Sequence, residues 1–159
     1  MSRILRGGHR RISCGAMTRM LASLLLMALA ACTPAAPDIA VTDVWGRATA
    51  SGQTTGAAYM TIANNGEAAD RLLSAKASLS QTSMLHATRT DNGISSMTMV
   101  ETLDIPAKGR VALTPGGTHL MIIDLAVPMN AGDRFFVDLK FEKSGNKTVG
   151  GKIVAAGSR

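Results

Sequence analysis

Short runs in which apolar and polar residues alternate dominate the chain after residue 38. The clearest run is 135–142, where apolar side chains at 135, 137, 139 and 141 alternate with charged ones at 138, 140 and 142. Successive side chains of a β-strand point to opposite faces, so this pattern predicts a strand with one buried face.

Comparable runs predict strands at 39–45, 57–63, 70–75, 82–88, 95–100, 110–113, 118–125 and, as a last edge strand, 152–155. The sequences Asn64-Asn65-Gly66 and Asp91-Asn92-Gly93 are strong turn signals between them. We find no long helical period. The pattern therefore predicts one all-β domain at 39–155, an antiparallel sandwich or small barrel, with a tail at 156–159.

The N-terminal 31 residues have the form of a secretory signal. Five arginines precede an uncharged apolar run at 21–31, which is shorter than the roughly 20 apolar residues that a membrane-spanning helix needs. Met17 is an alternative start to Met1. The run ends in Leu29-Ala30-Ala31-Cys32, which resembles a bacterial lipoprotein cleavage box, so we expect lipid on Cys32 and a tether at 32–38. Ordinary cleavage without a lipid is the alternative.

Removing this leader changes the charge of the chain. The whole sequence has 17 Lys and Arg and 11 Asp and Glu, a formal net charge of +6. Five of the arginines and none of the acids lie in 1–31, which leaves twelve basic and eleven acidic residues, or +1. The high pI therefore belongs to the leader. Aromatic residues are scarce as well, so nothing in the domain favours nucleic-acid binding.

Cysteine narrows the possible chemistry. Cys14 lies in the leader and Cys32 is the expected lipid site, so the domain itself contains no thiol. A disulfide framework, a cysteine-type zinc site and a thiol nucleophile are excluded there. A blue-copper electron-transfer centre is excluded as well, because it requires a Cys thiolate.

The two histidines of the domain stand among methionines. The array is His86, ten residues, Met97, twenty-one residues, then His119-Leu120-Met121. Residues two apart on a strand share a face, so His119 and Met121 should project together while Leu120 enters the core. Neutral imidazole and thioether ligands suit Cu(I), a soft cation, better than Mg²⁺ or Ca²⁺.

Methionine is also a common core residue, so packing in the core is the alternative role for the other methionines near the array. Met60 lies inside an apolar strand pattern and is expected in the core. Met129, in a Pro-Met-Asn turn, is expected on the surface. Met84 and Met99 each lie two residues from a candidate ligand; core filling, walls of the site and spare sulfur donors all fit them.

The spacing His86-x10-Met97-x21-His119-x-Met121 matches the signature of the PCu(A)C family of periplasmic copper chaperones without a gap. The chain resembles that family over nearly the whole domain, in segments 44–48, 56–64, 70–72, 105–107 and 115–119. It departs from the family at Met84, where an acidic residue is common, and it lacks the His- and Met-rich tail that some members have.

The resemblance implies a cupredoxin-like Greek-key β-sandwich that binds one Cu(I) in the periplasm and is not an enzyme. His86, Met97, His119 and Met121 carry over as the metal ligands. The implied task is delivery of copper toward the copper-A centre of cytochrome c oxidase, with subunit II or a Sco-type thiol protein as the acceptor. The lipid would hold the chaperone at a membrane, and no nucleic-acid partner is expected.

Two other functions fit the composition. A non-metal adhesion or scaffold sandwich would make the His/Met array incidental. A zinc-dependent hydrolase is a weaker alternative, because such sites favour His and carboxylate ligands over Met, and the chain has neither a Gly-x-Ser-x-Gly nor a His-Glu-x-x-His motif.

Overall fold

The computed structural model describes residues 35–159. The predicted signal at 1–31 and the lipid site Cys32 lie outside the described residues. Within 35–159 the regular elements are all strands: β1 (Ile39–Arg47), β2 (Gly56–Asn64), β3 (Asp70–Ala77), β4 (Thr82–Asp91), β5 (Ile94–Val100), β6 (Leu103–Ile105), β7 (Arg110–Leu113), β8 (Thr118–Ile123), β9 (Arg134–Phe141) and β10 (Asn146–Val154). The predicted all-β class is confirmed. This part of the chain contains no helix that is long and apolar enough to cross a membrane.

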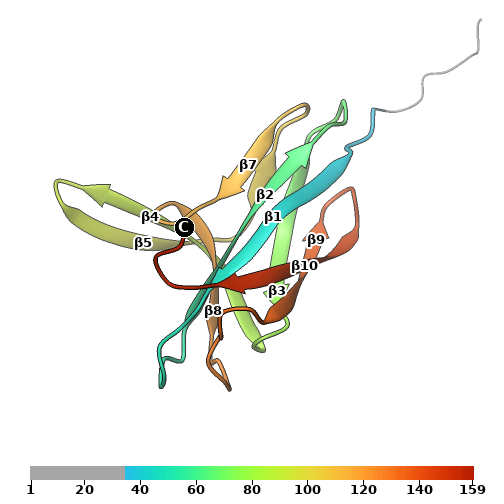
Figure 1. Cartoon of the computed structure of the whole chain (residues 1–159). Coiled ribbons are helices and arrows are strands. Elements are labelled where there is room, and N and C mark those ends of the chain that lie inside the picture. Colours follow the sequence, from blue (N-terminus) through green and yellow to red (C-terminus); the bar gives the residue numbers. More distant parts are fainter. Residues whose placement is uncertain (1–34) are drawn as a thin grey trace, which may run out of the picture. The chain divides into compact units, whose positions relative to one another are not determined.

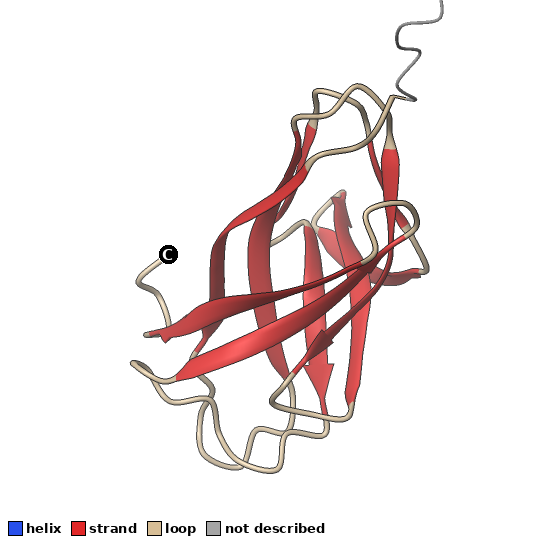
Figure 2. Cartoon of the chain, turned by 90° about the vertical axis from the view of Figure 1, so that its right-hand side faces the viewer, coloured by secondary structure: helices blue, strands red, loops and turns tan. Residues whose placement is uncertain are grey.

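The strands form one hydrogen-bonded path in the order β5-β4-β8-β2-β1-β10-β9-β3-β6, and β7 pairs with β2 beside this path. The pairing of β1 with β10 is parallel, and the other pairings are antiparallel. The path curls so that its two halves face each other, as Figures 1 and 2 show. Strand β5 lies at one end of this path and therefore forms a free edge of the sheet.

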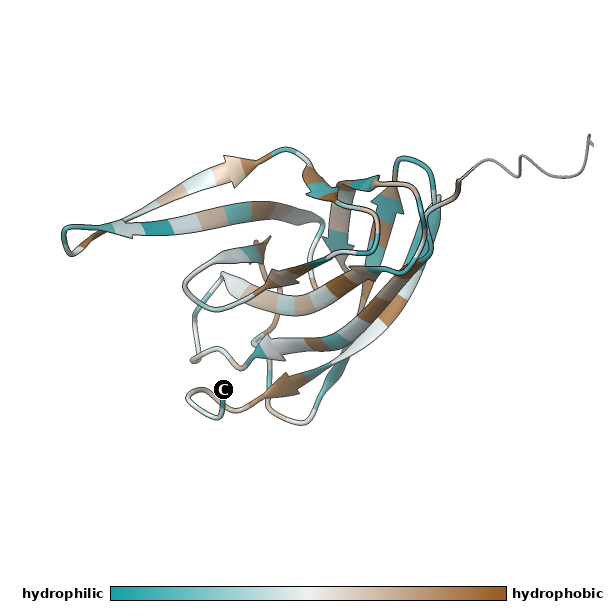
Figure 3. Cartoon of the chain, turned by 90° about the horizontal axis from the view of Figure 1, so that it is seen from above, coloured by the Kyte–Doolittle hydropathy of each residue, from teal (hydrophilic) through white to brown (hydrophobic). Residues whose placement is uncertain are grey.

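The core fills the space between the two halves. Phe135, Val137, Leu139 and Phe141 of β9 are buried, as the alternation predicted, and they pack with Ile62 and other buried side chains of one cluster. Figure 3 shows apolar and polar segments alternating along the strands. Residues 35–159 thus form one compact unit with its own core.

Strand β10 corrects the prediction of a short last edge strand at 152–155. It begins at Asn146 and lies inside the path, between β1 and β9. Its Gly151 lies so close to Phe135 that a Cβ there would come within 2.7 Å of the aromatic ring. Because glycine has no side chain to alternate, the hydropathy pattern concealed this strand.

Met129 also corrects a prediction, since it is 1% exposed and not a surface residue. Its side chain lies against the backbones of Gly46 and Gly56, where an added Cβ would come within 2.6 Å and 2.4 Å of it. The side chain of Met129 is therefore buried against the sheet, because the two glycines leave room for its thioether. Met60, 2% exposed, is a core residue as predicted.

A buried carboxylate fastens β3 to the turn between β9 and β10. Asp70 is 4% exposed and accepts hydrogen bonds from the backbone N–H groups of Arg71, Lys143 and Ser144 at 2.8–3.0 Å. Burial alone would raise the pKa of Asp70, but hydrogen bonds from Ser144, Lys143 and Arg71 outweigh it and hold that pKa below its ordinary value. The ionised carboxylate is therefore part of the folded structure.

Candidate metal centre

Three neighbouring strands carry the four predicted ligands. β4 lies between β5 and β8; His86 of β4 is directly opposite His119 of β8 on one side and Met99 of β5 on the other. Directly opposite residues of an antiparallel pair point to the same face and have Cβ atoms roughly 5 Å apart. His86 is therefore flanked on one face by a second imidazole and a thioether.

The other two predicted ligands lie on the same face. Met121 follows His119 by two residues and is opposite Met84 of β4. Met97 is opposite Thr88 of β4, which places it diagonally next to His86. The structure therefore gathers the four predicted residues on one face of β5-β4-β8 and places Met84 and Met99 beside them.

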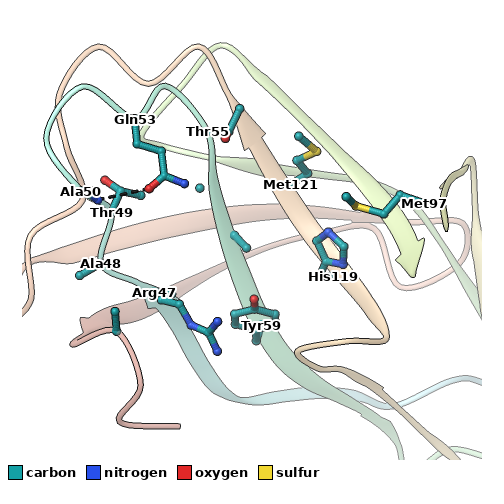
Figure 4. A pocket seen from close by; sticks show the side chains of 13 residues that line it. Arg47, Ala48, Thr49, Ala50, Gln53, Thr55, Tyr59, Met97, His119 and Met121 are labelled. Atoms are coloured by element: carbon teal, nitrogen blue, oxygen red, sulfur yellow. Dashed lines mark hydrogen bonds between the residues drawn. The ribbon is translucent and has the colours of Figure 1, made fainter. Parts of the chain in front are cut away.

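The face borders an open cavity of about 450 Å³. Met97, His119 and Met121 line it, and Figure 4 shows their side chains directed toward a common space. Met97 is 60% exposed on the edge strand β5, whereas His119 and Met121 are half-buried. The predicted site thus combines two sheltered donors with one that solvent or a partner can reach.

The orientation of His119 is set by its own strand. Its Nδ1 lies 3.0 Å from the carbonyl oxygen of Gly117. A carbonyl oxygen only accepts hydrogen bonds, so Nδ1 carries the proton and donates it. The lone pair is then on Nε2, the arrangement by which a backbone carbonyl commonly orients a metal-binding imidazole.

His86 differs from His119 in having no such partner. Both of its ring nitrogens are buried, and neither makes a hydrogen bond within residues 35–159. Buried polar atoms without partners are uncommon and destabilise a fold, so each one calls for an explanation. An ion coordinated by His86 would satisfy one of these nitrogens.

The donors on this face are soft or neutral. Residues 35–159 contain no group of three or more His, Cys, Asp or Glu side chains close enough to hold a metal ion together. The candidate donors are instead imidazole nitrogens and thioether sulfurs, which match Cu(I) in softness and supply no charge. The residues present therefore fit Cu(I).

Residues of β1 and β2 form the opposite wall of the cavity, and sequence reasoning did not assign them to it. Arg47 and Tyr59 line it, and the Tyr59 ring lies against Trp45 with 4.3 Å between ring centroids. The guanidinium of Arg47 donates to the carbonyl oxygen of Arg159 at 3.2 Å. The sequence signal for this wall was the resemblance of segments 44–48 and 56–64 to the family, which contain Arg47 and Tyr59.

Comparison with known proteins supports the resemblance. Residues 39–153 match the family model described as "Putative lipoprotein LpqE-like". A curated relative, "Putative lipoprotein Lxx21020" of Leifsonia xyli subsp. xyli (strain CTCB07), is 32% identical over 115 residues, which cover 72% of this chain and 68% of the relative.

Two solved structures are similar to this chain in overall fold. The copper-bound PCuAC domain from PmoF2 has a TM-score of 0.62 and 26% identity, with 74% of this chain and 92% of that one covered. The solution structure of CuI-DR1885 from Deinococcus radiodurans has a TM-score of 0.56 and 28% identity, with 84% and 85% covered.

The predicted cupredoxin-like fold is confirmed by these neighbours. Because the family model matches most of the chain and its solved structural neighbours are PCuAC domains, this protein belongs to the LpqE-like family, which is of the PCuAC type.

Proposed function

We propose that this protein is an extracytoplasmic copper chaperone that binds one Cu(I) through His86, Met97, His119 and Met121. The observation that carries the proposal is the pair of buried, unpartnered ring nitrogens of His86, directly opposite a histidine whose Nε2 is free to coordinate. The names of two structural neighbours, copper-bound PmoF2 and CuI-DR1885, support copper as the cargo.

The spacing of the imidazoles supports a shared ion. The ring centroids of His86 and His119 are 6.2 Å apart, with an angle of 52° between the ring planes. A bond from a metal to an imidazole nitrogen is about 2 Å long, so two rings bound to one ion have centroids roughly 5–6 Å apart. The two histidines can therefore bind one Cu(I) with little movement of the backbone.

Transfer follows from the exposure of one ligand. Met97 lies on an edge strand, where an incoming thiolate can replace its neutral thioether while the two histidines still hold the ion. We propose that the protein acts as a carrier and not as a catalyst. The acceptor is the copper-A centre of cytochrome c oxidase, through subunit II or a Sco-type thiol protein.

The cellular setting is part of the same proposal. The LpqE-like family and the lipoprotein relative support attachment through lipid on Cys32. A lipid anchor and the tether after it would keep the domain at the membrane surface in the periplasm, where membrane-bound acceptors are within reach.

The test is a Cu(I) titration of the domain of residues 35–159 under reductant, with a competing chromophoric chelator. We expect high-affinity binding in the native domain and its loss in His86→Leu and His119→Leu. Met60→Leu, which changes a core methionine away from this face, is the matched control and should bind as the native domain does. A native domain that does not bind Cu(I), or binding that survives both histidine replacements, would refute the proposal.

A further inference from the structure

On the same face of β5-β4-β8, a second set of three residues repeats the arrangement of the predicted site. All three residues of this second set are methionines. We define the His row as Met97, His86 and His119, and the Met row as Met99, Met84 and Met121. Each member of the Met row lies two residues along its strand from the corresponding member of the His row. Because β4 runs antiparallel to both neighbours, all three displacements point in the same direction.

The cross-strand relations in the two rows are the same. His119 is directly opposite His86, and Met121 is directly opposite Met84. Met97 is diagonal to His86 in the β4–β5 register, and Met99 is diagonal to Met84 by the same offset. Side chains so related lie roughly 5 Å apart when opposite and 7–8 Å apart when diagonal, which long thioether side chains can span. If the His row can converge on one ion, the Met row can also do so.

Two members of the Met row border a second cavity. Met84 and Met99 line an opening of about 160 Å³ together with Glu101, whereas Met121 lines the larger cavity beside Met97 and His119. Met99 is 59% exposed, so its thioether does not fill the core and is open to solvent. The carboxylate of Glu101 adds negative charge beside the sulfurs, which attracts a cation without having to bind it.

We infer that Met84, Met99 and Met121 form a second Cu(I) position of three thioethers, next to the first and sharing Met121 with it. This inference rests on the proposed function, because the shared ligand belongs to the proposed site. Three neutral thioethers select a soft monovalent ion. They bind it less strongly than the set that includes two imidazoles, so the Met row receives or releases copper and the His row holds it.

Passage between the rows is an exchange of ligands around one ion. Met121 keeps its bond to Cu(I) while the bonds to Met84 and Met99 break and bonds to the His row form. All donors are neutral and copper remains Cu(I), so no electron and no proton is transferred. A shared ligand avoids release of free Cu(I) into solvent during the move.

The experiment uses Ag(I), a soft monovalent ion that is not oxidised in air, and the domain of residues 35–159. With Ag(I) in excess both positions should fill, with Met121 bridging the two ions, so native mass spectrometry should show two Ag(I) per chain, and Met84→Leu/Met99→Leu should retain one. Met60→Leu is the matched control and should retain two. In the native domain labelled with ¹³C at the methionine methyls, the first equivalent should shift the Met97 signal and the second should shift Met84 and Met99.

The outcomes separate the two proposals. A native domain that takes up one Ag(I), with no change in Met84→Leu/Met99→Leu, overturns the second position and leaves the proposed function standing. Failure of the native domain to bind any ion overturns both. The methyl spectra need no variant, so methyl signals of Met84 and Met99 that stay fixed through the second equivalent also overturn the inference.

Discussion

Replacing His86 with leucine should stabilise the metal-free protein while abolishing its Cu(I) binding. Both ring nitrogens of His86 are buried without a hydrogen-bond partner in residues 35–159. One nitrogen of a neutral imidazole is a donor and the other an acceptor, so two polar groups are left unsatisfied. Each such group costs about 1–3 kcal/mol, and replacement by an apolar group of similar shape removes that cost.

We expect a gain of about 2 kcal/mol in the free energy of unfolding, which is at the low end of the range for two such groups. The ring is partly exposed, so a small movement of the side chain can bring a nitrogen toward water and lower the cost. For a domain of this size that corresponds to a rise of roughly 8 °C in Tm. The measurement is thermal and urea unfolding of the metal-free native and variant domains, followed by circular dichroism. Cu(I) should raise the Tm of the native domain and leave that of the variant unchanged.

His119→Leu is the matched control, since it makes the same chemical change directly across the strand pair. It removes the hydrogen bond from Nδ1 to the Gly117 carbonyl, so it should be neutral or destabilising by about 1 kcal/mol. If His86→Leu lowers the stability of the metal-free domain, or changes it by no more than His119→Leu does, the unsatisfied nitrogens of His86 are not the stability cost inferred here.

Three further changes have definite expected results. Met97→Leu keeps the volume but loses the exposed thioether, so the Cu(I) affinity measured by chelator competition should fall at least about tenfold; an unchanged affinity would remove Met97 from the ligand set. Asp70→Asn should lower stability near neutral pH by about 2 kcal/mol, because three N–H groups lose a charged acceptor. Since the pKa of Asp70 lies below its ordinary 3.8 in the folded state, its contribution is present above about pH 4 and is lost as the pH falls through the lowered pKa; the variant should therefore show a flatter loss of stability in acid urea titrations, and an equally steep one would contradict this. Met129→Ala should cost about 3 kcal/mol in urea unfolding, as expected for a cavity against Gly46 and Gly56, whereas a surface methionine would cost little.

The hydropathy pattern located most of the strands because most of them have one buried and one exposed face. It failed where a strand carries little side-chain signal. Leu103–Ile105 is a three-residue strand and was not predicted at all. Strand β8 ends at Ile123 and not at the predicted residue 125, because Asp124 adopts a positive φ of 57° that breaks the extended backbone.

The turn at Asn92-Gly93 sets the pairing of His86 with its neighbour on β5. Asn92 and Gly93 both have positive φ, 48° and 80°, as a two-residue type I′ hairpin turn requires. Such a turn fixes the register of the strands it joins, and counting outward from it pairs His86 with Met99. The pairing of His86 with Met99 therefore follows from the sequence if Asn92-Gly93 is taken as a two-residue type I′ turn.

The pairing of His86 with His119 could not be obtained in that way, because β4 and β8 are far apart in the sequence and no short turn joins them. Their register depends on the core. Leu85 and Leu120, which are directly opposite each other, are 4% and 0% exposed. Burying both forces the alternate residues of each strand to the other face, where the histidines meet. A slip of one residue would expose the leucines and separate the imidazoles together. The packing that stabilises this sheet therefore also assembles the candidate metal site, so no separate interaction is needed to bring the two histidines together.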